Sequence, residues 1–169
     1  GTDIINASLG YTTFNDKTMD YRYEHLDGRT ALASQAADLA FDRGMIVVVS
    51  AGNEGNSEWK HIGVPSDARG ALAIAATTLR GVRASFSSEG PAADGRVKPD
   101  LAAPGQFVAV ASPDSYQVMA GSGTSFAAPI MSGLIASLWQ AFPEATNAEI
   151  VDALRRSAHQ SEAPDGLLG

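Results

Sequence analysis

Ser125 is the residue whose position first suggests catalytic chemistry. It follows the sequence Gly-Ser-Gly-Thr at residues 121–124 and begins a long apolar segment that reaches about residue 142. Such a segment predicts a helix, and the free N–H groups and positive dipole at a helix start favour an oxyanion beside a serine hydroxyl. By position alone a simpler role is commoner, in which Thr124 or Ser125 caps the helix.

Asn53 is a second polar residue in a position that suits catalysis. It follows residues 45–50 (MIVVVS), a β-branched run typical of a central parallel strand. An asparagine just beyond such a strand can aim its side-chain NH2 group into the cleft above a sheet and donate to an oxyanion. The commoner role of an isolated Asn-Glu-Gly sequence is an ordinary turn, so both interpretations stay open at this point.

Alternating strand and helix patterns surround these two residues. Strands are predicted at residues 3–9, 45–50 and 71–77, with short extended pieces at 101–103 and 107–111. Helices are predicted at residues 28–43, 147–157 and from 124 to about 142, and the polar and aromatic residues 11–27 are expected to form a surface loop. This order implies β-α-β units and therefore an α/β fold, with a parallel sheet that has helices on both faces. In such sheets the chemistry lies at the carboxyl ends of the strands. Glycine-containing loops follow the predicted strands there, at Gly10, 52–55 and 121–123.

The composition excludes several classes of function. The formal net charge is −7 and no basic run occurs, which argues against nucleic acid and an anionic membrane surface as partners. The chain has no cysteine, so disulfides, thiolate catalysis and cysteine-based zinc sites are excluded. No apolar stretch reaches the roughly 18 residues of a membrane span. A nucleotide-binding loop at 121–123 is disfavoured, because it lacks the G-x-G-x-x-G spacing and no P-loop lysine follows.

Four segments together carry a resemblance to a known family. They are GTSFAAP at 123–129, SAGN at 50–53, INASLG at 5–10 and KPDLAAPG at 98–105. In their order and spacing they resemble the nucleophile motif, the oxyanion-hole motif, the substrate-cleft strand and a fourth segment of the subtilisin-like serine proteases, or subtilases. The resemblance covers nearly the whole chain, although residues 11–27 match poorly. It implies a subtilisin-like α/β fold and a serine endopeptidase that hydrolyses peptide bonds.

The resemblance assigns catalytic roles to two residues and substrate binding to a strand. Ser125 would attack the scissile carbonyl and form an acyl-enzyme. Its backbone N–H and the Asn53 side chain would hold the oxyanion. A polypeptide substrate would pair as an added strand with Ser8, Leu9 and Gly10.

The resemblance also implies a pocket for the side chain that precedes the cut. Its lining would be Ser50, Ala51, Gly52 and Gly63. Because these walls are small and mostly uncharged, we expect a large apolar or aromatic side chain in the pocket. Glu54 would lie at the rim, where it would tolerate a basic side chain.

Two further features follow from the resemblance. The Val64-Pro65 bond is predicted to be cis, whereas most X-Pro bonds are trans. Relatives often place a weak cation on nearby backbone carbonyls. In this chain the carbonyls would be those of Ser66, Ala68 and Ala71, and calcium would be the ion, although no cofactor is required for the chemistry.

The catalytic Asp and His of the family have no counterpart in the chain. Their expected place is before Asp3, so we interpret residues 1–169 as a partial peptidase domain that lacks its N-terminal half and is inactive alone. The three histidines, His25, His61 and His159, are each expected to be exposed and solvated. A non-catalytic peptide-binding or interaction module from a pseudoprotease is the alternative interpretation.

Loss of the N-terminal half would leave the strand at residues 3–9 as an exposed sheet edge. An apolar edge pairs with another strand or aggregates. We therefore expect association from Asp3 to Leu9, either with the missing half or with a second copy. The habit of the family suggests a secreted or cell-envelope protein.

Overall fold

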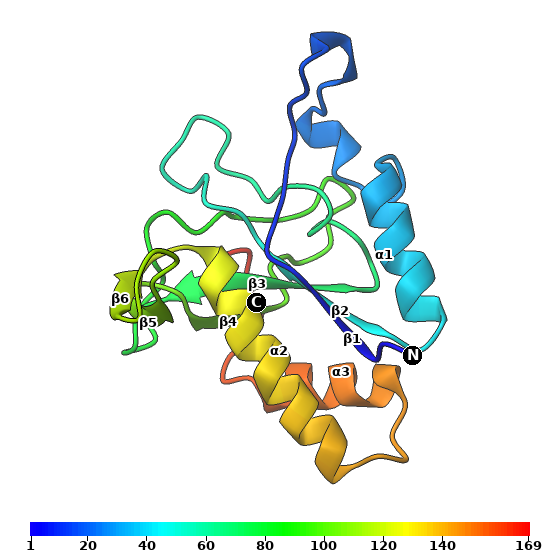
Figure 1. The fold of residues 1–169 in the computed structure, drawn as a ribbon. Coiled ribbons are helices and arrows are strands. Elements are labelled where there is room, and N and C mark those ends of the chain that lie inside the picture. The colour runs from blue at the N-terminus through cyan, green and yellow to red at the C-terminus, as the bar shows by residue number, and fades with distance from the viewer.

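The structure, a computed structural model, describes all residues from 1 to 169. A parallel sheet contains β1 (Ile4–Ala7), β2 (Ile46–Ser50), β3 (Ala71–Thr77) and β4 (Leu101–Pro104), in that order across the sheet (Figure 1). A separate antiparallel hairpin is formed by β5 (Val108–Ala111) and β6 (Val118–Gly121). The helices are α1 (Leu32–Asp42), α2 (Thr124–Ala141) and α3 (Asn147–Ser157), with short 3-10 helices at Lys17–Met19 and Tyr23–His25.

The two central strands of the sheet, β2 and β3, are largely apolar. Every residue of both strands is buried, as expected for parallel strands that are covered on both faces. Alternate side chains then serve two different cores. Val48 and Ile74 belong to the larger core, whereas Val47 and Val49 belong to a smaller core on the other face.

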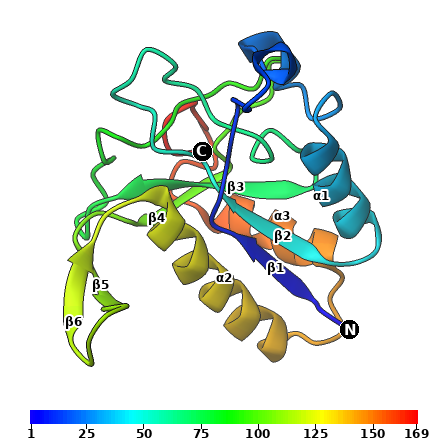
Figure 2. The ribbon, with the colours of Figure 1, turned by 45° about the horizontal axis from the view of Figure 1, so that its top comes forward.

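The helices divide between the two faces of the sheet (Figure 2). Ala37 of α1 packs in the smaller core, while Ile135 of α2 and Leu154 of α3 pack in the larger one. The start of α3 is fixed by a capping box in which Thr146 and Glu149 bond reciprocally. No helix is both long and apolar enough to span a membrane.

The β1 side of the sheet is open. β1 pairs with β2 in register from Ile4 to Ala7 and has no strand on its other side. The face of α2 beside β1 carries Ser132, which bonds to Asn6 of β1, and also Ala136 and Trp139, which line a hollow with Asp3 and Ile4. The unpaired edge of β1 and this face of α2 are therefore open on the same side of the sheet.

The fold agrees with the sequence in class and in most of its elements. The α/β architecture is confirmed, and β3 and α3 have the predicted bounds. The strand predicted at 3–9 is shorter in the structure, where β1 covers Ile4–Ala7, and the helix predicted at 28–43 begins only at Leu32. The cis bond between Val64 and Pro65 is confirmed. The extended pieces predicted at 101–103 and 107–111 are observed as β4 and β5. Sequence patterns did not indicate β6 or its pairing with β5, because β6 is short and largely exposed.

Residues 11–27 were expected to be a surface loop and are more ordered than that. The rings of Tyr11, Phe14 and Tyr21 follow one another edge to face, with centroids 5.4 Å apart in each pair. Leu26 is fully buried in a third core. Aromatic packing, rather than a helical or strand period, organises this segment, which explains why periodicity did not reveal it.

Candidate active site

A cleft of about 570 Å³ lies at the carboxyl ends of β1 and β2, beside the start of α2. Its lining includes all the predicted catalytic and substrate-binding residues except Ser8, which contacts Ser125 directly. The predicted residues in the lining are Leu9, Gly10, Ser50, Ala51, Gly52, Asn53, Gly63 and Ser125, together with Glu54, which was expected at the rim. Sequence reasoning missed other lining residues, which come largely from the segment after β1 and the turn before Gly63: Tyr11, Thr12, Thr13, Trp59, His61 and Thr124.

Ser125 lies in the first turn of α2 and is bound to the segment after β1. Its Oγ donates to the carbonyl oxygen of Ser8 at 3.3 Å. The hydroxyl of Ser8 donates in return to the carbonyl oxygen of Ser125 at 2.9 Å. This reciprocal pair fixes the position of the first turn of α2 relative to the predicted substrate strand.

Pro129 explains why the Ser125 carbonyl is available. In a regular helix that oxygen would accept from the N–H of residue 129. Proline has no N–H, so the intrahelical bond is missing and the hydroxyl of Ser8 replaces it. Further along α2, the hydroxyl of Ser132 donates to Asn6 Oδ1 at 3.0 Å and ties the same helix to β1.

Asn53 is oriented by Thr124. The backbone N–H of Thr124 donates to Asn53 Oδ1 at 2.8 Å, and the threonine hydroxyl donates to the same oxygen at 3.0 Å. Because the amide oxygen is committed to two donors, the NH2 end of Asn53 must point the other way. The Asn53 Nδ2 atom makes no hydrogen bond within the chain.

The two predicted oxyanion donors lie near one point. A Cβ atom added to Gly123 would be 3.5 Å from Asn53 Nδ2 and 3.7 Å from the Ser125 backbone nitrogen. Any side chain at position 123 would therefore occupy the space next to both nitrogens. Glycine keeps this space open between the loop after β2 and the first turn of α2.

Glycines also shape the predicted pocket. Gly52 has a φ of 117°, a conformation that disfavours other residues, and a Cβ there would lie 2.7 Å from Ser88 Oγ. At Gly63 the nearest heavy atom to an added Cβ is the Tyr11 nitrogen at 3.8 Å, so the space beside it is open. A main-chain bridge between Tyr11 and Val64 closes this side of the cleft.

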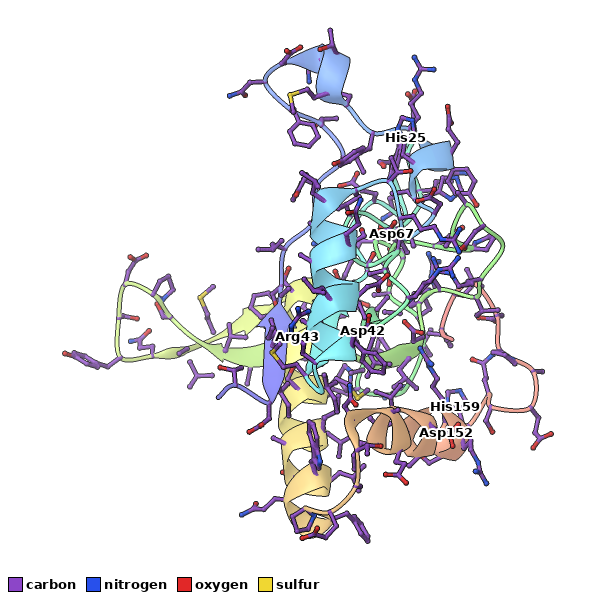
Figure 3. The ribbon with its side chains drawn as sticks, turned by 90° about the vertical axis from the view of Figure 1, so that its right-hand side faces the viewer. His25, Asp42, Arg43, Asp67, Asp152 and His159 are labelled. Atoms are coloured by element: carbon purple, nitrogen blue, oxygen red, sulfur yellow. The ribbon has the colours of Figure 1, made fainter.

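The histidines depart from the expectation that all three are exposed. His159 is exposed, and Figure 3 shows it beside α3, far from His25 near the other end of the molecule. His25 is half-buried, and its Nδ1 accepts from the Arg22 N–H at 3.0 Å. His61 is also half-buried, because the segment at 12–27 brings the ring of Tyr23 to 4.2 Å from it.

His61 is the histidine that lines the cleft, but it is not bonded to Ser125. Its Nδ1 is buried without a hydrogen-bond partner, and its ring also packs edge-on against Trp59. The Ser125 hydroxyl instead uses the Ser8 carbonyl as its acceptor. The structure thus brings together the predicted nucleophile, the oxyanion donors and the pocket residues, without an imidazole on the nucleophile.

A serine at a helix start, flanked by oxyanion donors at the carboxyl ends of a parallel sheet, is typical of serine hydrolases on α/β folds. The chain matches the subtilase family over residues 1–169. It therefore belongs to the subtilases, a family of serine proteases.

Individual relatives agree with this assignment. The chain is 30% identical to the serine protease AprX of Bacillus subtilis (strain 168), covering 96% of this chain and 39% of AprX. It is 33% identical to subtilisin of Bacillus pumilus, covering 92% of this chain and 49% of that protein. A solved structure of the PatG macrocyclase in complex with peptide superposes with a TM-score of 0.71 at 25% identity, covering 99% of this chain and 48% of the other. The chain thus spans less than half the length of each of these relatives.

The orientation of Asn53 should depend on the Thr124 hydroxyl. Thr124→Val keeps the shape but removes the hydroxyl, which also accepts from the Gly52 N–H at 3.2 Å. We expect a lower order parameter for the Asn53 side-chain amide in nitrogen relaxation measurements, and a free energy of unfolding lowered by about 1–3 kcal/mol. Thr124→Ser is the matched control and should retain both values. An unchanged order parameter in Thr124→Val would show that the Thr124 backbone N–H alone is sufficient.

Proposed function

We propose that this chain carries the nucleophile, the oxyanion donors and the substrate pocket of a serine endopeptidase that cleaves polypeptides through an acyl-enzyme on Ser125. The observation that carries the proposal is the double hydrogen bond from Thr124 to Asn53 Oδ1. It leaves the Asn53 NH2 group as a donor beside the first turn that holds Ser125.

The chemistry uses each part of the site in turn. The Ser125 oxygen attacks the scissile carbonyl, and the hydroxyl proton passes to a general base and then to the departing amine. The negative oxygen of the tetrahedral intermediate is held by the Ser125 N–H and Asn53 Nδ2. Water then attacks the acyl-enzyme by the same route and releases the second product. One well-placed oxyanion donor contributes about 100- to 1,000-fold to such a reaction.

The general base is proposed to come from outside this chain. A serine hydroxyl is a poor nucleophile until a base accepts its proton. The hydrogen-bond acceptor of the Ser125 hydroxyl is the Ser8 carbonyl, which cannot carry the proton away. Neither His25 nor His159 lines the cleft, and His61 makes no bond to Ser125. We therefore propose that a partner segment supplies the triad His and Asp, and that this chain alone is inactive.

The open side of the sheet is the proposed place for that partner. β1 has one unpaired edge, and Ala136 and Trp139 of α2 line a hollow beside its start, together with Asp3 and Ile4. A segment that added strands to β1 would cover this hollow and bring its own groups towards Ser125. The relatives support this arrangement, since this chain covers 39% of AprX and 49% of the Bacillus pumilus subtilisin. A second copy of the chain is the other proposed occupant.

The proposed substrate is an extended polypeptide. It would pair with the segment from Ser8 to Gly10, which the reciprocal bonds to Ser125 hold next to the nucleophile. The pocket beside Gly63 has small walls and open space, which suits a large apolar or aromatic side chain. The related PatG macrocyclase has been solved in complex with a peptide, which supports a peptide ligand. We also propose that the protein is exported from the cell, and this proposal rests on its family membership alone.

A fluorophosphonate probe tests the proposed division of the active site. We expect little labelling of Ser125 in this chain alone, because no base activates the hydroxyl. Refolding the chain with the N-terminal part of a subtilase that carries the Asp and His motifs should produce strong labelling. Ser125→Ala should abolish that labelling, whereas Ser122→Ala, at an exposed serine nearby, should not. Robust labelling of the chain alone would contradict the proposal, and a complemented site that binds peptide without labelling would indicate a binding module.

Pocket size can be tested at Gly63 in the same complemented enzyme. Gly63 does not have a positive φ, so its backbone conformation accepts a side chain. Gly63→Leu should fill the open space and lower kcat/KM for cleavage after Phe by at least about 10-fold relative to cleavage after Ala. The ratio of the two substrates within one variant controls for any general loss of activity. An unchanged ratio would place the pocket elsewhere.

Association through the open edge can be measured by light scattering after size-exclusion chromatography. The chain alone is expected to form dimers or larger species, because the apolar edge strand β1 has no partner on one side. Ala136→Lys places a charge at an exposed position of α2 in the hollow beside Asp3 and Ile4, and it should reduce the mass towards that of a monomer. Leu79→Lys, at a leucine that is 77% exposed in a turn, is the matched control and should leave the mass unchanged. A monodisperse wild-type monomer whose β1 amides exchange freely would contradict the proposal.

A further inference from the structure

Lys98 is a charged side chain inside the protein. It is only 1% exposed and is the largest fully buried side chain in the chain. It comes just before β4, in the segment whose motif resembles that of the subtilases. A buried ammonium group needs compensating oxygen atoms, so its contacts indicate what the site is built to hold.

Two oxygen atoms hold the Lys98 ammonium. Its Nζ donates to Asp100 Oδ2 at 2.6 Å and to the carbonyl oxygen of Ala71 at 2.7 Å. Asp100 Oδ2 also accepts from the Ala73 N–H at 2.7 Å, and its Oδ1 accepts from Arg155 of α3. Burial lowers the pKa of Lys98, and the Asp100 carboxylate acts against that shift. The result is a polar cage that joins β3, β4 and α3.

The Ala71 carbonyl is one of the three on which the family resemblance predicts a weak cation. A backbone carbonyl and a carboxylate are ligands that calcium prefers, at about 2.4 Å from the ion. Here both the Ala71 carbonyl and Asp100 already hold the ammonium of Lys98. A calcium ion on the same carbonyl would lie in contact with this positive charge and be repelled by it.

A second backbone carbonyl among residues 67–71 is also bound by a cationic side chain. The NH2 group of Arg96 donates to the carbonyl oxygen of Asp67 at 2.7 Å. Arg96 and Lys98 are two residues apart, and both direct cationic groups at the backbone of residues 67–71. The residues present therefore do not fit the predicted calcium ion.

We infer that the Lys98 ammonium occupies the position of the weak cation that relatives bind at the Ala71 carbonyl, so that the fold of this chain is stabilised by its own lysine in place of calcium. The inference concerns the fold and does not depend on the proposed peptidase function. It makes the stability of the chain independent of free divalent cations.

The test is thermal unfolding of the complete 169-residue chain, followed by circular dichroism in excess EDTA and in calcium chloride. The wild type should unfold at the same temperature in both, and terbium luminescence should show no saturable binding. Lys98→Glu replaces the ammonium by a carboxylate beside Asp100. This variant should unfold at a lower temperature in EDTA and gain about 5–10 °C when calcium is at about 100 times its Kd.

Two controls make the result decisive. Lys98→Met removes the charge without adding a ligand, so it should be less stable in both solutions and gain nothing from calcium. Lys60→Glu, at an exposed lysine, makes the same charge change elsewhere and should behave as the wild type. Saturable calcium or terbium binding by the wild type, with loss of stability in EDTA, would overturn the inference. A folded Lys98→Glu variant whose unfolding temperature does not rise with calcium would also overturn the inference. If that variant does not fold, the wild-type measurement in EDTA and calcium tests the inference on its own.

Discussion

The contact between Thr124 and the loop after β2 is the interaction on which the site depends. Thr124 is fully buried, and its hydroxyl both accepts from the Gly52 N–H and donates to Asn53. One side chain thereby joins the carboxyl end of a central strand to the first turn of the longest helix. The sheet sets the position of Gly52 and Asn53, α2 sets the position of Ser125, and Thr124 holds the two parts together.

A second set of bonds places the same helix against β1. The missing N–H of Pro129 leaves the Ser125 carbonyl without an intrahelical partner, and the Ser8 hydroxyl takes its place. The proline that ordinarily weakens a helix here creates an acceptor at the point where two elements must meet. The proposed substrate strand and the proposed nucleophile are therefore positioned relative to each other by this pair of serines, with the bond from Ser132 to Asn6 further along α2.

Sequence reasoning predicted the parts of this structure that depend on short-range patterns. The buried run of β2, the seven residues of β3 and the capped helix α3 all follow from strand and helix periods and capping chemistry. Ser125 and Asn53 were found from their positions at a helix start and just after a buried strand, and from the family resemblance. The loop at 121–123 was expected to follow a strand of the parallel sheet, but it follows β6 of the separate hairpin. The role of Thr124 was not foreseen, since a buried threonine beside a nucleophile has no distinctive local pattern. The position of His61 was missed because Tyr23 and Trp59, which cover it, belong to segments without regular period.

The buried pair of Lys98 and Asp100 bears on how the stability of the fold depends on the ions in solution. A bound metal is lost by dilution or to a stronger chelator, and each rebinding costs translational freedom. The ammonium of Lys98 is covalently attached to the chain through its side chain, so it cannot dissociate and be lost in this way. The oxygen cage around Lys98 is thus filled as soon as β3 and β4 meet, whatever ions the surroundings contain.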